Sequence, residues 1–187
     1  MQTSTTTQQL LAAALTALES GDGWRAVLDE LPVPVYTTDA EGLVTFWNRA
    51  CVDFAGREPQ LGKDQWCVTW RIHTPSDDFL PHDRCPMAIA IQEQREVHGT
   101  VAIAMRPDGS RKAFAPYPTP LFDKAGRLTG AVNLLVDVSA EQADALAVQA
   151  ERCRRLARTV CDRQATDALN RMAEGYERNV EGLRAAG

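Results

Sequence analysis

Two strand–turn–strand patterns separated by a helical stretch constrain the fold of this chain more than any other feature. In the first, the apolar run Val33–Thr38 leads into the turn residues Asp39–Gly42, and Leu43–Trp47 returns. Turn residues of the same kinds (Pro, Asp and Gly) separate the later apolar runs. Those runs predict three more strands, which are Val97–Met105, Arg111–Leu121 and Leu128–Val138. The pattern predicts an α+β fold with a five-stranded antiparallel sheet and helices on one face.

Two helices are predicted between the strand pairs. Asn48 precedes Arg49–Ala55, where its side-chain oxygen can accept the unpaired amides of a first helical turn. Asp83–Gln94 has the second helical pattern, and Pro86 fits there only in the first turn. Prolines within the fourth strand each remove a backbone donor and imply an edge or a bulge; they are Pro116, Pro118 and Pro120.

Helical patterns also flank the predicted sheet. Leucines from Leu10 to Leu18 recur at helical spacing and predict an N-terminal amphipathic helix. From Ala140 onward, small and apolar residues recur at alternating spacings of four and three, and Asp162 is a predicted cap at a break. A helical hairpin and one long broken helix both fit this region. We therefore expect three parts: an N-terminal helical cap (1–30), a central domain (31–139) and a C-terminal interaction region (140–187).

Charge and composition exclude several classes. The net charge is −5, and from Ala140 onward eight Lys and Arg face eight Asp and Glu, so no basic face for nucleic acid is expected. No apolar run reaches the length of a membrane span, and the N-terminus lacks the pattern of a signal peptide, so a cytoplasmic location is expected. The five cysteines are an odd number without a CxxC pair, which favours reduced thiols.

The order of these elements over Leu31–Ser139 resembles the PAS family of sensory and docking domains. The matching features are the first strand, the turn at Asp39–Gly42, Asn48 before a short helix, and the closing Asp137-Val138-Ser139. The resemblance implies sensing of small molecules, light or redox state in a cavity, or docking and dimerisation. It also implies that a signal leaves through the last strand, with Asp137 and Ser139 as signal-transfer residues that hold the first amides of the next helix. An ordinary helix cap without switching is the alternative.

Candidate pocket residues lie in the segments that would form the cavity wall. They are Trp66, Trp70, His73, His82 and Asn133. A neutral imidazole of His73 or His82 could ligate haem. The segments around the cysteines do not match the reactive-thiol helix of a flavin photosensor.

Simpler interpretations of the same segments remain open. Cys67, His82, Asp83 and Cys85 include metal-ligand types without a recognised spacing, so no metal site is predicted. The tryptophans, with Cys67 and Met87, could instead form ordinary core. Asn133 interrupts an apolar strand, so it either faces a colourless ligand or lies on the surface.

The predicted function is that of a stand-alone PAS signalling adaptor. No nucleophile–base pair or carboxylate dyad is apparent, so we expect no enzymatic activity. The region after Ser139 has no histidine and no effector motif, so its output is expected to be physical contact. The resemblance suggests a regulatory partner such as a histidine kinase of a bacterial two-component pathway, and a homodimer. A cofactor or small-molecule sensor, with haem, flavin or a colourless ligand, is the alternative.

Overall fold

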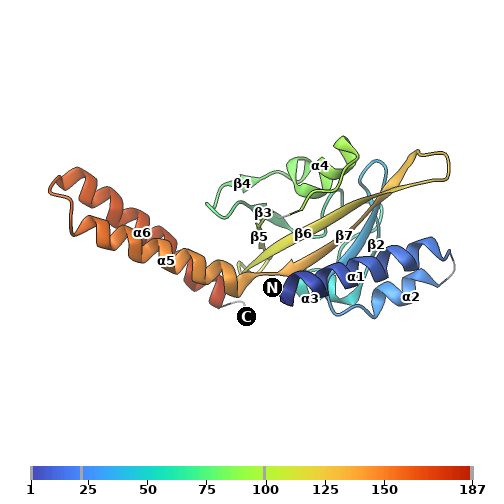
Figure 1. Cartoon of the computed structure of the whole chain (residues 1–187), viewed down its shortest axis with the longest axis horizontal. Helices are drawn as coiled ribbons and strands as arrows, with labels where there is room; N and C mark the ends of the chain where they lie inside the picture. Colours follow the sequence, from blue (N-terminus) through green and yellow to red (C-terminus); the bar gives the residue numbers. More distant parts are fainter. Residues whose placement is uncertain (1, 22, 99, 186–187) are drawn as a thin grey trace. The chain divides into compact units, whose positions relative to one another are not determined.

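The computed structural model describes residues 2–21, 23–98 and 100–185 and confirms the α+β class. Within these residues, one antiparallel sheet has the strand order β2-β1-β7-β6-β5-β3-β4 (Figure 1). The strands are β1 (Val35–Asp39), β2 (Val44–Trp47), β3 (Arg71–His73), β4 (Phe79–Leu80), β5 (Ala102–Met105), β6 (Arg111–Phe122) and β7 (Leu128–Asp137). The helices are α1 (Gln2–Glu19), α2 (Trp24–Asp29), α3 (Arg49–Ala55), α4 (Pro86–Glu93), α5 (Ser139–Ala157) and α6 (Arg163–Arg184), with a 3-10 turn η1 (His82–Arg84).

The described sheet has seven strands, two more than the five that were predicted. The additional strands β3 and β4 form a short hairpin in which Ile72 pairs with Leu80, and β3 pairs with β5. Strands of three and two residues are too short to show an alternating pattern, so the sequence carried no signal for them. The other five strands lie where they were predicted, with ends shifted by a few residues.

Helices α3 and α4 cover one face of the sheet, as predicted, and the N-terminal helices α1 and α2 flank its other face. Neighbouring residues of β1 point to opposite faces: Tyr36 joins a core formed with α3 and α4, whereas Val35 joins a core formed with α1 and α2. The leucines of α1 pack on that second core. The amphipathic stripe at the N-terminus is therefore buried against the sheet of its own chain.

The prolines of β6 are buried and lie in the part of the strand that extends beyond the short strand β5. β6 has twelve residues and pairs with β7 along Phe114–Phe122, whereas β5 has four residues. Because β5 leads into β6 through the turn at 106–110, it reaches only the first residues of β6. The register also shifts between Leu121 and Phe122. Missing proline donors therefore fall where no partner strand needs them.

The C-terminal region is a helical hairpin, which resolves the alternative left open by the sequence. α5 and α6 pack on each other and form a compact unit together with residues 110–113, while the remainder of the described chain forms another. Asp162 caps α6 by accepting a hydrogen bond from the Ala165 amide at 2.7 Å. Arg154 and Glu177 join the two helices through two hydrogen bonds of 2.7 and 2.5 Å.

Asn48 is fully buried and makes more hydrogen bonds through its side chain than any other core residue in the described structure. Its oxygen caps α3 at the Cys51 amide (3.2 Å) and also accepts from the Val35 amide of β1 (3.1 Å). Its amide group donates to carbonyls of the segment that joins α2 to β1; these are Leu28, Leu31 and Val33, at 3.1, 3.3 and 2.9 Å. One side chain therefore ties together α2, β1 and α3.

We expect Asn48→Ala to lower the free energy of unfolding by about 2–4 kcal/mol, because it leaves several buried backbone groups without partners. Asn48→Asp keeps the cap but turns a carboxylate toward three carbonyls, so it should also destabilise the fold. Urea denaturation measures both changes. Asn170→Ala, at a half-buried amide on α6, is the control and should cost nothing. A loss below 1 kcal/mol for Asn48→Ala would contradict the role of Asn48.

Candidate functional site

A chain of hydrogen bonds crosses the α3–α4 side of the sheet, where the sequence predicted a cavity. The Asn133 amide donates to the Tyr36 hydroxyl at 3.0 Å, and that hydroxyl donates to the Trp66 carbonyl at 3.0 Å. The Asn133 oxygen accepts from the Tyr117 amide at 2.9 Å. We call Tyr36, Trp66, Tyr117 and Asn133 the Tyr36–Asn133 network. It links β1, β6 and β7 to the segment before β3.

Asn133 is buried, with 2% of its surface exposed, so it does not face solvent. Of the two interpretations of this residue, the buried one is therefore correct. Its partners come from the protein itself, because both ends of the amide are engaged by β1 and β6. Burial of Tyr36 raises the pKa of its phenol well above the usual range, so the hydroxyl remains a donor.

Trp66 adopts a backbone conformation that is unusual for a large residue. Its φ is 69°, in the left-handed region, and its amide donates to the Gly42 carbonyl at 2.7 Å. The indole lies directly against Gly42: a Cβ at that position would come within 2.2 Å of the ring. Glycine is therefore needed at position 42 for two reasons: its φ of 84° is unfavourable for other residues, and the indole of Trp66 leaves no room for a side chain. This packing holds a strained residue whose carbonyl anchors the network.

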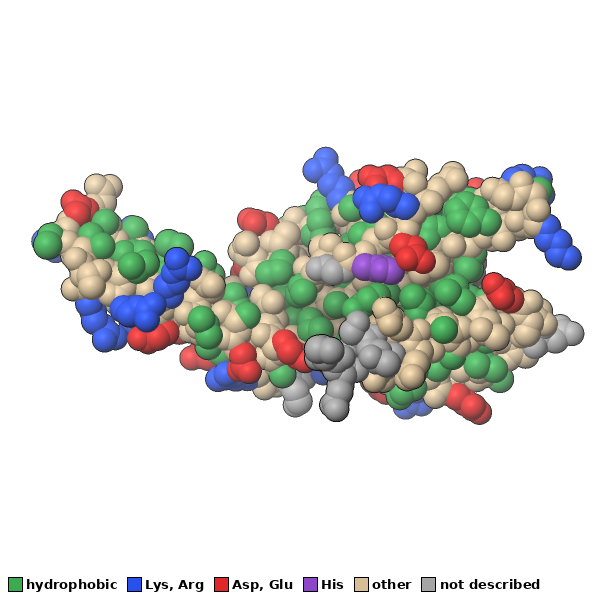
Figure 2. All heavy atoms as spheres, in the orientation of Figure 1, with side chains coloured by type: hydrophobic (Ala, Val, Ile, Leu, Met, Phe, Trp, Pro, Cys, Tyr) green, Lys and Arg blue, Asp and Glu red, His purple; other side chains and the backbone are tan. Residues whose placement is uncertain are grey.

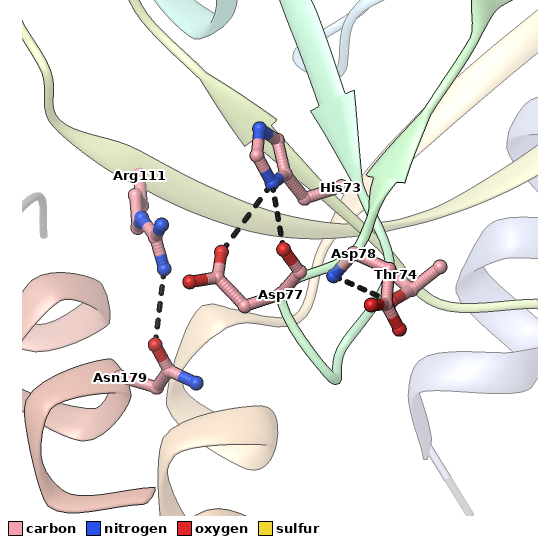
Figure 3. Close-up of polar contacts among 6 residues, drawn as sticks. All are labelled: His73, Thr74, Asp77, Asp78, Arg111 and Asn179. Carbon is pink, nitrogen blue, oxygen red and sulfur yellow. Dashed lines mark hydrogen bonds and ion pairs between the residues drawn. The ribbon is translucent and has the colours of Figure 1, made fainter. Parts of the chain in front are cut away.

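The structure separates the other predicted pocket residues. Trp70 is 41% exposed and carries the Arg71 guanidinium 4.4 Å from its ring centroid, so it does not belong to the core as one interpretation supposed. His73 lies on β3, where its Nδ1 is 3.1 Å from the Asp77 carbonyl and 3.3 Å from the Asp77 carboxylate (Figure 3). Trp66 and Cys67 pack in the core as the same interpretation expected.

His82 is the predicted residue with the most distinctive environment. It lies in η1, and its Nε2 is buried without a hydrogen-bond partner among the described residues. Burial lowers the pKa of its imidazole; the charge of Arg57 acts in the same direction, whereas Asp64 and Asp83 oppose it. The Trp47 Nε1 atom is likewise buried and unpaired within the described chain. Such atoms mark places where a water or a ligand atom can bind.

Cys67 and Cys85 lie in the core, where burial disfavours their thiolate forms. Burial raises the pKa of the Cys67 and Cys85 thiols, that of Cys85 to about 12. The Cys67 sulfur lies 3.1 Å from the Thr69 hydroxyl. Among residues 2–21, 23–98 and 100–185, no three His, Cys, Asp or Glu side chains lie together in a way that could hold a metal ion.

At the end of β7, the N-cap position of α5 is Val138, whose side chain has no acceptor. Ser139 is the first helical residue, and its hydroxyl accepts from the Ala113 amide at 3.0 Å. Asp137 is exposed at the last position of β7. The role of both residues in signalling stays a prediction.

Several important residues were missed at the sequence level. Tyr36 appears in the sequence as one apolar member of a strand, and its partner Asn133 is 97 residues away. Arg111 donates to the Asn179 side chain at 3.0 Å within the hairpin unit, a contact that depends on the three-dimensional arrangement (Figure 3). A polar residue inside an apolar strand was the only available signal, and it identified Asn133.

Comparison with known proteins identifies the fold family. Residues 24–93 match the family model for the PAS domain. An RNA-binding Light-Oxygen-Voltage receptor aligns with 24% identity and a TM-score of 0.53 over 71% of this chain and 38% of that chain. A Rhodobacter sphaeroides LOV protein aligns with 15% identity and a TM-score of 0.45 over 87% and 96% of the two chains. A comparison with curated proteins finds no match. The chain therefore contains a PAS domain, which the family model places at residues 24–93.

The interior does not fit a flavin photosensor that uses a cysteine. The buried thiols Cys67 and Cys85 are held protonated by their surroundings. The Asn133 amide, which could have met a polar cofactor edge, already bonds to Tyr36 and Tyr117. We therefore derive no chemistry through a flavin. No described helix is long and apolar enough to cross a membrane.

Removing the Tyr36 hydroxyl tests the network. Tyr36→Phe leaves the buried Asn133 amide and the Trp66 carbonyl each without a partner, so we expect the free energy of unfolding to fall by about 1–3 kcal/mol. Amide hydrogen exchange should also accelerate at residues 65–67. Tyr117→Phe is the matched control, because that hydroxyl makes no hydrogen bond within the described structure. Equal stability of the two variants would contradict the network.

The lowered pKa of His82 predicts a pH dependence of stability. In the unfolded chain the imidazole takes up a proton near pH 6.5, whereas the folded protein resists this. The contribution of neutral His82 to the free energy of unfolding is therefore fully present above pH 6.5. It is lost as the pH falls through the lower pKa of the folded state. Urea titrations at pH 7 and pH 5 should show a smaller stability loss for His82→Gln than for the unaltered chain. His98→Gln, at a 40%-exposed side chain, serves as control, and identical losses for all three proteins would refute the prediction.

Proposed function

We propose that this protein is a PAS signalling adaptor whose output is a contact made by the α5–α6 hairpin. In this proposal the partner is a regulatory protein, such as a histidine kinase of a two-component pathway or its regulator, and the protein acts in the cytoplasm without catalysing a reaction. The sequence from 140 to 187 has no histidine, so the hairpin itself has no histidine to accept a phosphoryl group.

The observation that supports this proposal is the apolar surface of the hairpin. Val148, Leu156 and Met172 are 66%, 42% and 50% exposed, although α5 and α6 already bury their facing sides against each other. In Figure 2, apolar side chains lie among the charged ones on this orange and red part of Figure 1. Large apolar side chains left exposed on one helical hairpin favour a surface that meets a partner.

The chemistry around Val148 suggests what the partner presents. A hollow of about 400 Å³ is lined by Ala147, Val148, Glu151, Arg152 and Arg155. Ala147 and Val148 form its apolar part, and Arg152 and Arg155 outweigh the single acid Glu151 at its border. An amphipathic helix that carries an apolar side chain beside acidic residues would complement this surface. A second copy of the hairpin is a further expected contact, which would give the homodimer.

Both β6 and β7 connect to the hairpin unit. The first residues of β6 belong to that unit together with α5 and α6. The Val138 amide donates to the Ala113 carbonyl at 2.9 Å, and the Ser139 hydroxyl bonds to the same residue. Arg111 at the start of β6 holds Asn179 of α6. A change in β6 or β7 would therefore act on both helices.

An affinity capture experiment tests the proposal. We expect Val148→Asp/Met172→Asp to reduce recovery of the regulatory partner from a lysate roughly tenfold or more, because a carboxylate would be buried in an apolar contact. Both positions are exposed, so the thermal midpoint should stay unchanged. Quantitative mass spectrometry of the captured proteins gives the measurement.

The control is Gln149→Asp, which adds one carboxylate at an exposed neighbour of Val148, half the charge of the double variant, and should capture the partner normally. Recovery that is the same for the double variant and the unaltered chain would refute the hairpin as the output surface.

A further inference from the structure

We propose that a cavity between α1, α2 and the sheet binds a small zwitterion with an apolar body, such as a hydrophobic α-amino acid. The cavity, which we call the α1–α2 cavity, has a volume of about 580 Å³. It is lined by α1, α2, β1, β2, β6 and β7, and all of its lining residues belong to the compact unit that contains residues 1–109 and 114–137. This inference goes beyond the proposed adaptor function and does not depend on it.

The size and the walls of the α1–α2 cavity suit a small organic molecule. Leu15 and Leu18 of α1, Trp24 of α2, and Leu121 with Phe122 of β6 form its apolar part. The Trp24 ring is fixed edge-to-face on Phe46, with centroids 5.2 Å apart. Phe122 is 47% exposed although an apolar cavity lies beside it. Pockets of this volume with mostly apolar walls and a few polar groups are typical ligand sites.

Hydroxyl groups on the sheet provide the polar part. The Thr37 and Thr45 oxygens are 2.8 Å apart, and in such a pair the accepting hydroxyl keeps its own proton for a third group. Thr38 also lines the cavity.

One cation and one anion border the same cavity, and they determine the ligand class. Arg25 and Glu19 both line it, and neither forms an ion pair with another residue in the described parts of the chain. The Arg25 guanidinium lies over the Trp24 ring, 4.5 Å from the centroid, which keeps it at the cavity wall. A ligand carboxylate would meet Arg25 and a ligand ammonium would meet Glu19. The apolar walls then accommodate the ligand side chain.

Binding at this position would act on strands that reach the hairpin. Leu121 and Phe122 belong to β6, and Thr129, which also lines the cavity, belongs to β7. A bound molecule would therefore contact the two strands whose other ends enter the C-terminal unit. The Tyr36–Asn133 network lies on the opposite face of the sheet, so the two features are distinct.

Calorimetric titration of the full chain tests the proposal, with Trp24 fluorescence as a second readout. The probes are L-phenylalanine and L-leucine, together with phenylalaninamide, which lacks the carboxylate, and 3-phenylpropionate, which lacks the ammonium. We expect saturable binding of at least one amino acid, and phenylalanine to bind roughly tenfold or more tightly than either of its analogues. Absence of saturable binding by both amino acids at millimolar concentration would overturn the proposal.

Charge-neutral variants separate the two polar contacts. Arg25→Gln should weaken binding of phenylalanine and 3-phenylpropionate, whereas Glu19→Gln should weaken phenylalanine and phenylalaninamide but spare 3-phenylpropionate. Both side chains are exposed, so the fold should be unaffected, which the thermal midpoint checks. Arg49→Gln and Glu30→Gln, exposed residues that do not line the cavity, are the matched controls. Phenylalanine affinity that is unchanged in Arg25→Gln and Glu19→Gln would overturn the assignment.

Discussion

The buried amide of Asn48 is the constraint on which the PAS core depends. Its oxygen fixes the start of α3 and the start of β1, and its nitrogen satisfies carbonyls of the turn that leaves α2. Regular secondary structure does not supply these side-chain bonds, because the segment between α2 and β1 belongs to neither a helix nor a strand. A single residue thus sets the position of the N-terminal helices relative to the sheet.

The polar groups on the two faces of the sheet differ in how fully they are hydrogen-bonded. This difference affects where a ligand can bind. On the α3–α4 face, Asn133, Tyr36 and the strained Trp66 bond to one another, so a ligand there would have to replace existing hydrogen bonds. On the α1–α2 face, hydroxyls and two unpaired charges border open space. Admitting a polar molecule at the Tyr36–Asn133 network therefore costs more than admitting one to the α1–α2 cavity.

Patterns of local origin were predictable from the sequence, and features set by tertiary contact were not. Asn48 and Asp162 cap helices as expected, since a cap needs only the residue and the turn that follows it. The hairpin β3–β4, the exposure of Trp70 and the packing of α1 on the second face depend on neighbours distant in the sequence. Asn133 was identified as unusual, but its partner Tyr36 could not be inferred from alternation alone.

The two helices of the hairpin begin in different ways, and the difference lies where the sheet delivers the chain. α6 has a side-chain cap, the bond from the Ala165 amide to Asp162, whereas the described start of α5 has Val138 at its N-cap and no such bond. Glu141 in the first turn of α5 offers only a weaker interaction with the helix dipole. The Ala113 backbone bonds to this end through the Val138 amide and the Ser139 hydroxyl. Because Ala113 lies on β6, the first turn of α5 is held by a neighbouring strand, and a shift of that strand alters the helix start directly.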